Sequence, residues 1–225
     1  MANLMRRDEL IQRLRDTLGP KYIDKHPFMQ LLYRGELSRK QVRAWIVNRF
    51  YLQNNIGSKD AAILSNCPVP EVRRLWLTRS IKREGLESAV GDVEGWLALG
   101  EAAGLRREAV LTARCLPGVR FAVNELVNFA RRGGWLEGVS TSLYEALAKD
   151  ELAKRVEALK SHYQWIRPEG LRFFLSRLGH VERDSKVVVD LVMKYARDRR
   201  AQEASLTAAG TYAEVVWAMH DAGRS

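Results

Sequence analysis

The 225-residue chain has few of the residues from which metal centres and disulfide frameworks are built. Its two cysteines, Cys67 and Cys115, lie far apart and form no CxxC motif, so neither a zinc site nor a disulfide is predicted. Its four histidines show no His-x-x-x-His or Glu-x-x-His spacing. His26 precedes a proline and His162 precedes a tyrosine, positions typical of capping or packing histidines. A metal site would have to assemble from distant helices.

Several other sequence signals are missing. No apolar run reaches about eighteen residues, so no membrane span is predicted. The N-terminus lacks the apolar segment of a signal peptide, which favours a cytoplasmic location. No glycine-rich phosphate loop and no Gly-x-Ser-x-Gly elbow is present, so nucleotide binding and serine hydrolysis have no motif to support them. Strands are not predicted either, because no Asn-Gly or Asp-Gly turn separates alternating runs.

The chain instead has an excess of basic residues, with a formal net charge of +10. These residues are scattered in short clusters, and no zinc-finger, RNA-recognition or basic-zipper pattern accompanies them. We therefore expect neither nucleic acid nor a membrane as partner. Most of these charges are interpreted as solvated helix faces, and the rest as cations converging on a small polyanion.

Apolar residues recur at helical spacing through most of the chain, in segments that begin or end at proline or glycine. A long helical pattern follows Pro168, with possible joints at Gly179 and Gly210. The short connections indicate antiparallel neighbours. We predict a compact all-α bundle of seven to nine helices in a single domain spanning residues 1–225. The expected helices cover residues 10–18, 27–35, 38–64, 70–85, 92–104, 106–112, 119–130, 135–148 and 150–160, and 168 to near the end.

The helix predicted for residues 38–64 contains an anomaly. Ser38 and Gln41 make a capping box at its start, and an apolar stripe follows. Arg49 and Gln53 lie on or beside this stripe. Burying a guanidinium without an anionic partner costs several kcal/mol, on the order estimated for buried ions. Either an internal carboxylate pairs with Arg49, or the helix lines a cavity that receives an anion.

Three more arginines, Arg79, Arg120 and Arg177, stand among apolar residues. Internal pairing and an anion pocket are both open for them. The candidates for internal pairing are Asp60, Glu125 and Glu145. Arginine binds carboxylates through two parallel hydrogen bonds, so a cluster of arginines suits a polycarboxylate.

Long segments of the chain, from about residue 20 to about residue 221, resemble the pyrroloquinoline-quinone synthase family. The segments that carry the resemblance are KHPF (25–28), QVRAWIVNRFYLQ (41–53), KDAAILSNCP (59–68), LPGVRFAV (116–123), NFARR (128–132) and HYQWI (162–166). The resemblance implies a haem-oxygenase-like all-α fold and a homodimer. It also implies the last step of pyrroloquinoline quinone formation, which is ring closure with multi-electron oxidation by O2 as co-substrate. That step uses no metal or organic cofactor, and its precursor carries several carboxylates.

The resemblance divides the site residues into two groups. The positions that hold the ligand in the family are matched here by Arg49, Gln53, Lys59, Arg79, Arg155 and Arg177. The positions that handle protons are substituted: Ile23, Arg83 and Leu152 stand where the synthase has histidines, Phe173 replaces a tyrosine and Tyr212 replaces a lysine. Isoleucine, leucine and phenylalanine cannot exchange protons. Tyr212 and Arg83 are therefore the remaining candidates for a catalytic role at these positions.

A related branch of the fold binds two metals through glutamate and histidine, which raises one more alternative. The residues near such positions are Glu84, Glu145, His180 and Asp184, whereas Gly91 and Val187 stand where two histidines are expected. The leading hypothesis is an oxidase that binds a polycarboxylated aromatic or quinonoid molecule. The alternatives are a binding protein that kept the pocket and lost turnover, and a metal-dependent oxidase.

Overall fold

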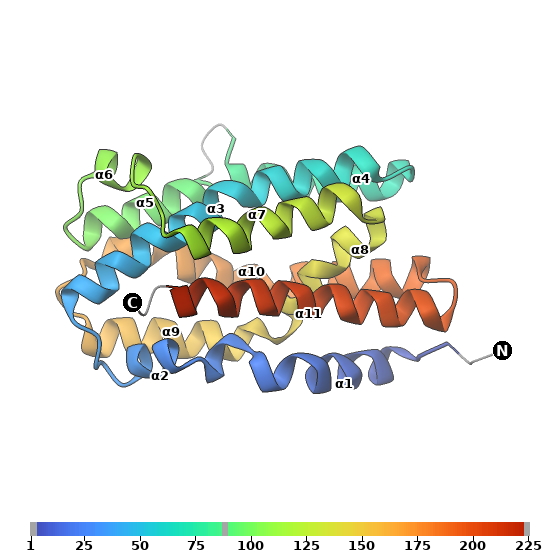
Figure 1. Ribbon diagram of the computed structural model, residues 1–225, viewed down its shortest axis with the longest axis horizontal. Coiled ribbons are helices and arrows are strands. Elements are labelled where there is room, and N and C mark those ends of the chain that lie inside the picture. Colours follow the sequence, from blue (N-terminus) through green and yellow to red (C-terminus); the bar gives the residue numbers. More distant parts are fainter. Residues whose placement is uncertain (1–3, 87–89, 223–225) are drawn as a thin grey trace.

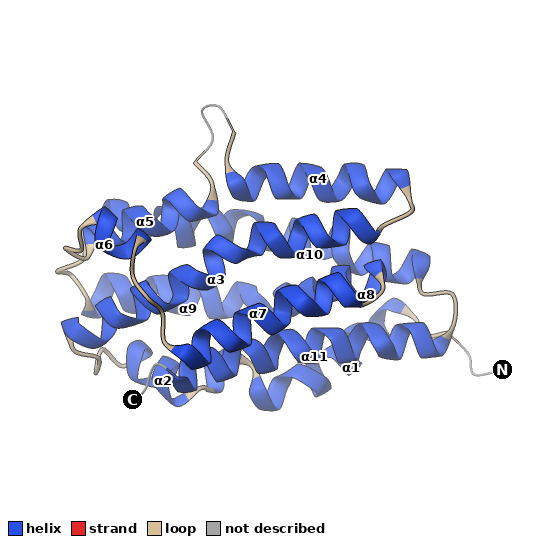
Figure 2. Ribbon diagram, turned by 45° about the horizontal axis from the view of Figure 1, so that its top comes forward, coloured by secondary structure: helices blue, strands red, loops and turns tan. Residues whose placement is uncertain are grey.

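A computed structural model describes residues 4–86 and 90–222 and confirms an all-α architecture. The described residues form eleven α-helices and four short 3-10 helices, and no strand is found among them (Figures 1 and 2). The helix count is thus somewhat higher than predicted. Part of the loop predicted between Gly85 and Gly91 lies outside the described residues. Among the helices of residues 4–86 and 90–222, none combines the length and apolarity that crossing a membrane requires.

The first half of the chain forms seven α-helices, and most begin or end where the sequence predicts. Their bounds are α1 Arg7–Leu18, α2 Pro27–Tyr33, α3 Arg39–Asn66, α4 Pro70–Glu84, α5 Asp92–Ala102, α6 Arg107–Leu111 and α7 Pro117–Arg132. Ser38 and Gln41 form the predicted capping box, each side chain binding the other residue's backbone N–H. His26 caps α2, because its Nδ1 accepts a hydrogen bond from the Phe28 N–H at 3.1 Å. Gly91 occupies the N-cap position of α5, and the helix begins at Asp92, the predicted start.

The second half departs more from the prediction. Its bounds are α8 Trp135–Ser140, η3 Thr141–Leu147, α9 Ala148–His162, η4 Pro168–Leu171, α10 Arg172–Tyr195 and α11 Arg199–Ala222. The helix predicted for 135–148 becomes a 3-10 helix from Thr141. Neither Gly179 nor Gly210 is a joint, since both lie inside continuous helices. The break falls instead between Tyr195 and Arg199.

The long helices pack side by side around a shared core. In Figure 1, α11 runs along the long axis of the molecule with α7 on one side and α1 on the other, and α3 and α4 lie beyond α7. The segments η2 (Ile23–Lys25), η3 and α9 come close to α11 or α10 inside this bundle. Residues from six or more helical segments therefore face one interior space.

Gly179 offers a test of the continuous α10 helix. It is exposed, and a Cβ built there meets no atom within 4 Å. Because glycine is about 0.5–1 kcal/mol less favourable than alanine inside a helix, Gly179→Ala should raise the free energy of unfolding by about that amount. Gly138→Ala is the contrasting variant, since its Cβ would lie 2.8 Å from Ile63 Cγ1, and it should destabilise the protein. Urea unfolding of both variants measures the difference. A loss of stability in Gly179→Ala would indicate a joint.

Candidate functional site

The interior space is a cavity of about 80 Å³ lined by both charged and apolar side chains. Residues from η2, α3, α4, α5, η3, α9, α10 and α11 line it. Its charged and polar lining residues are Arg49, Gln53, Arg83, Asp92, Tyr144, Glu145, Glu151, Arg155, Arg177 and Tyr212. Its apolar lining residues are Ile23, Leu52, Ile56, Ala148, Leu152, Phe173 and Val216. Of the six residues predicted to hold a ligand, four line this cavity.

Glu145, on η3, binds three of the arginines at once. Its Oε1 accepts hydrogen bonds from Arg79 Nη2 at 2.7 Å and from Arg83 Nη2 at 2.5 Å, and its Oε2 accepts one from Arg177 Nη2 at 3.0 Å. Burial alone would raise the pKa of Glu145, but the three guanidinium charges outweigh burial and hold that pKa well below its usual value. Glu145 is thus one of the internal partners that the sequence had left open.

Glu151, one turn before Arg155 on α9, neutralises that arginine. Arg155 Nε donates to Glu151 Oε1 at 3.0 Å, and the same oxygen accepts from the Tyr33 hydroxyl at 2.6 Å. Both members of the pair are buried. Sequence reasoning did not single out Glu151, because a glutamate four residues before an arginine is common on exposed helix faces.

Lys59 and Arg79 lie behind the cavity and do not line it. Lys59 is buried, and its Nζ donates to the hydroxyls of Thr141 and Ser142 at 3.3 Å each. Its Nζ also lies 3.4 Å from Asp60 Oδ1. Burial lowers the pKa of Lys59 and Asp60 opposes that effect. Arg79 contacts the site through its hydrogen bond to Glu145.

Arg49 differs from the other arginines of the site, because no ion pair or hydrogen bond of its guanidinium is found within residues 4–86 and 90–222. Its Nε and Nη1 atoms are inaccessible to solvent and have no hydrogen-bond partner there. The guanidinium carbon lies 5.7 Å from the Trp96 ring centroid, a cation–π distance. Burial and the charge of Arg155 lower the pKa of Arg49 to about 10, so it remains charged at neutral pH. The anomaly in the α3 stripe therefore corresponds to a cation at a cavity.

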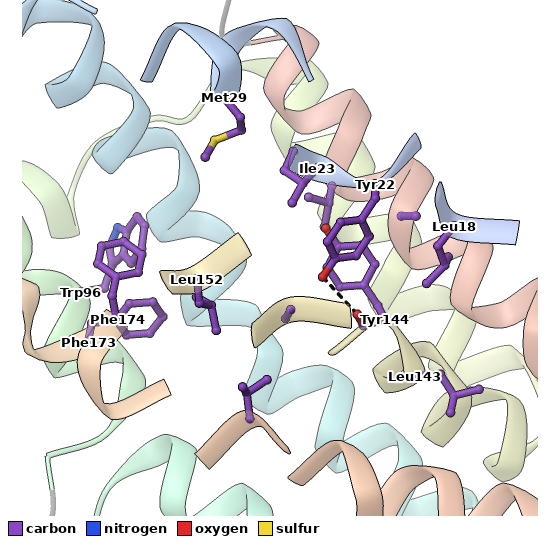
Figure 3. Packing of buried hydrophobic residues seen from close by; sticks show 14 of the residues in the cluster. Leu18, Tyr22, Ile23, Met29, Trp96, Leu143, Tyr144, Leu152, Phe173 and Phe174 are labelled. Carbon is purple, nitrogen blue, oxygen red and sulfur yellow. Dashed lines mark hydrogen bonds between the residues drawn. The ribbon is translucent and has the colours of Figure 1, made fainter. Parts of the chain in front are cut away.

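The five positions that the family resemblance predicts to be substituted all line the cavity. Ile23, Leu152 and Phe173 are buried, and Figure 3 shows them together with Tyr144 in the apolar packing around this space. Arg83 donates a hydrogen bond to Glu145. Burial raises the pKa of Tyr212, so its phenol is neutral at physiological pH and can donate a hydrogen bond.

Tyr144 is a lining residue that the sequence did not reveal. Its ring contacts that of Tyr212 in a tilted arrangement, with ring centroids 4.9 Å apart, and its backbone carbonyl accepts a hydrogen bond from the Tyr22 hydroxyl at 3.3 Å (Figure 3). Its own hydroxyl is buried without a partner in the described chain. Because it lies in the 3-10 segment that was predicted as regular helix, its direction could not be inferred from spacing.

The residues named for a metal-dependent oxidase do not form a cluster. Glu145 is occupied by three arginines, Glu84 and His180 are exposed, and Asp184 lies 3.6 Å from Arg183. Within residues 4–86 and 90–222, no group of three or more histidine, cysteine, aspartate or glutamate side chains is arranged to hold a metal ion. The metal-dependent alternative thus gains no support from this arrangement. Arg120 and Glu125, also considered above, are exposed on α7 and take no part in the site.

The fold defines the class of protein first. A protein from Shewanella denitrificans OS217 described as a domain of unknown function with a heme oxygenase-like fold superposes with a TM-score of 0.83 at 12% identity, covering 99% of this chain and 94% of that one. Heme oxygenase-2 from Synechocystis sp. PCC 6803 gives a TM-score of 0.65 at 15% identity, covering 95% of this chain and 84% of that one. The chain has the haem-oxygenase-like all-α fold.

Sequence comparison then gives the family. The model of the TENA/THI-4/PQQC family matches residues 13–222. A pyrroloquinoline-quinone synthase from Pseudomonas aeruginosa is 45% identical over 219 residues, 97% of this chain and 87% of that protein. The synthase from Cronobacter sakazakii is 41% identical over 220 residues, with the same coverage of 97% and 87%. The chain belongs to the TENA/THI-4/PQQC family and is similar to its pyrroloquinoline-quinone synthases.

Proposed function

We propose that the protein binds a polycarboxylated aromatic or quinonoid molecule in this cavity and supports its O2-dependent oxidation, as a pyrroloquinoline-quinone-synthase-like enzyme. The observation that carries the proposal is the charge of the site. Four arginines line the cavity (Arg49, Arg83, Arg155 and Arg177) against three carboxylates (Glu145, Glu151 and Asp92), and Arg79 adjoins it through Glu145. The excess positive charge calls for anionic groups from outside the chain.

The charged and the apolar lining residues suit different parts of such a molecule. Arg49 and the arginines around Glu145 face its carboxylates, and Gln53 and Tyr212 offer hydrogen bonds. Ile23, Leu152 and Phe173 face a flat apolar ring. The volume of about 80 Å³ is below the roughly 300–1,000 Å³ of most ligand sites. A ligand of the proposed class therefore enters only when lining side chains rotate, and its carboxylates would compete with Glu145 and Glu151 for the arginines.

The apolar lining residues also limit proton transfer in the site. General acid–base help contributes about 10²- to 10⁴-fold to proton transfer, and Ile23, Leu152 and Phe173 supply none. Proton transfer falls to Tyr212, Tyr144 and the lining carboxylates. We infer slow turnover with no cofactor from outside the chain. The same observation favours the alternative, a binding protein that no longer turns its ligand over.

The test mixes the full chain with the late precursor of pyrroloquinoline quinone, or with the finished quinone, and follows absorbance and oxygen uptake. We expect saturable binding of both molecules, and oxygen consumption with the precursor alone. An esterified quinone, which lacks the negative charges, is the matched ligand control and should bind far more weakly. Binding without oxygen uptake would support the binding-protein alternative. Equal binding of the ester and the acid would refute the anion site.

A further inference from the structure

A second, much smaller cavity lies next to the candidate site and shares Arg49 with it. Its volume is about 10 Å³, and its lining residues are Phe28, Trp45, Asn48, Arg49, Met219 and His220. This volume is close to the smallest, about 10–15 Å³, that holds one water molecule. Phe28 and Met219 provide apolar walls. Trp45 and Arg49 lie one turn apart on α3, and His220 comes from α11.

Three side chains of this cavity carry buried polar atoms without a hydrogen-bond partner in the described chain. These atoms are Trp45 Nε1, Arg49 Nε and Nη1, and His220 Nε2. The remaining polar lining residue, Asn48, has hydrogen-bond partners for both polar atoms of its side chain. Its Nδ2 donates to the Ala44 carbonyl at 2.9 Å, and its Oδ1 accepts from the Leu116 N–H at 2.9 Å. Leaving a buried polar group unpaired costs about 1–3 kcal/mol, so three such groups around one cavity call for a common partner.

The chemistry of the three groups identifies that partner. His220 Nδ1 lies 2.8 Å from the Val216 carbonyl, which only accepts, so Nδ1 carries the proton and Nε2 presents a lone pair. Burial and the charge of Arg49 hold the pKa of His220 well below its usual value, in agreement with a neutral ring. Trp45 and Arg49 can only donate. A water molecule can accept hydrogen bonds from both donors and donate one to the histidine. A simple anion fits less well, because the lone pair of Nε2 would repel its negative charge.

We propose that this cavity binds one water molecule, bridging Trp45, Arg49 and His220, and that the bridge positions the Arg49 guanidinium for the anionic ligand. Trp45 and His220 are then positioning residues of the site: they act through Arg49 and do not touch the ligand. Trp96, whose ring centroid is 5.7 Å from the guanidinium carbon, supports the same group through its ring. The role in ligand binding rests on the proposed function, whereas the water site itself does not.

Two measurements test the water site alone. A high-resolution crystal structure of the full chain should show a water within about 2.7–3.2 Å of Trp45 Nε1, an Arg49 nitrogen and His220 Nε2. In ¹⁵N NMR, His220 should be the neutral Nδ1–H tautomer. A dry cavity or an Nε2–H tautomer would each overturn the proposal.

Two variants of His220 test the positioning role. His220→Gln keeps an acceptor for the water, and His220→Phe removes it. In NMR, hydrogen exchange of the Arg49 Nε–H should speed up in His220→Phe and stay near the wild-type rate in His220→Gln. With pyrroloquinoline quinone as the probe, affinity should fall about 3- to 10-fold in His220→Phe and be largely retained in His220→Gln, the size expected for one hydrogen bond.

The exchange measurement separates this proposal from the proposed function. If the quinone fails to bind the wild-type protein, the exchange rates still decide whether His220 holds Arg49. A purely structural role for His220 would lower the melting temperature of both variants and leave the exchange rate and the affinity unchanged. That result would remove the positioning role.

Discussion

Replacing Glu145 by glutamine is expected to produce the largest loss of stability of any single substitution in the site. Its carboxylate binds Arg79, Arg83 and Arg177, and only 11% of its side chain is exposed. Removing one partner of a buried ion pair costs about 3–5 kcal/mol, because the remaining charge stays buried without compensation. For a chain of this size that loss corresponds to a melting temperature lowered by roughly 10 °C. Calorimetry at neutral pH measures it.

The same substitution should change how stability depends on pH. The folded-state pKa of Glu145 is held well below 4.5 by the three arginines, so its contribution is fully present above that value. The contribution is lost as the pH falls below about 4.5, toward the folded-state pKa. The difference in melting temperature between the wild type and Glu145→Gln should therefore shrink as the pH is lowered. A constant difference down to the acid transition would contradict the ion-pair explanation.

A control variant and an added anion complete the experiment. Glu182→Gln removes an exposed carboxylate that pairs with Lys149 on the surface, and no measurable change is expected. Sulfate should raise the melting temperature of Glu145→Gln more than that of the wild type, because an anion that binds the three freed arginines stabilises the folded state. Equal responses to sulfate would show that the arginines do not form an anion site.

Sequence reasoning predicted most of the fold for identifiable physical reasons. Proline at the first helical turn and glycine just past the last one mark both ends of α4. It failed at several points, and two of them have a clear physical cause. The 3-10 helix from Thr141 to Leu147 keeps a helical pattern of apolar residues, so periodicity does not reveal it. Helix propensity alone makes Gly179 a candidate joint, yet the packing of a 24-residue helix outweighs the cost of one glycine.

The sequence predicted that buried arginines form the candidate site, but not which arginine pairs with which carboxylate. A charge inside an apolar stripe pointed to Arg49 and Arg177, since burying a cation needs an explanation. Which arginine meets which carboxylate depends on distant helices: Glu145 is 66 residues from Arg79 and 32 from Arg177. The sequence pattern therefore could not show that Glu145 binds three arginines. Nor could it show that Arg49 has no carboxylate partner among the described residues. For the same reason, the sequence could not show that Lys59 does not line the cavity.

That difference in pairing yields the last prediction, for Arg49→Ala. The described residues give this guanidinium no carboxylate, so its removal exposes no orphaned anion and relieves the cost of burying a charge. The melting temperature should fall little. Affinity for pyrroloquinoline quinone should fall about 10- to 100-fold, because a hydrogen bond to a charged group is worth about 1.5–3 kcal/mol. Isothermal titration and thermal unfolding of the same samples measure both quantities.

Three further variants distinguish the causes. Arg49→Met keeps the length of the side chain beside Trp96 and should lose the same affinity as alanine. Arg155→Ala leaves Glu151 buried without its cation, so it should lose both stability and affinity. Arg120→Ala removes an exposed charge on α7 and should lose neither. A large drop in the melting temperature of Arg49→Ala with unchanged affinity would mean that this arginine supports the fold, and the anion would then have to be held by the cluster around Glu145 alone.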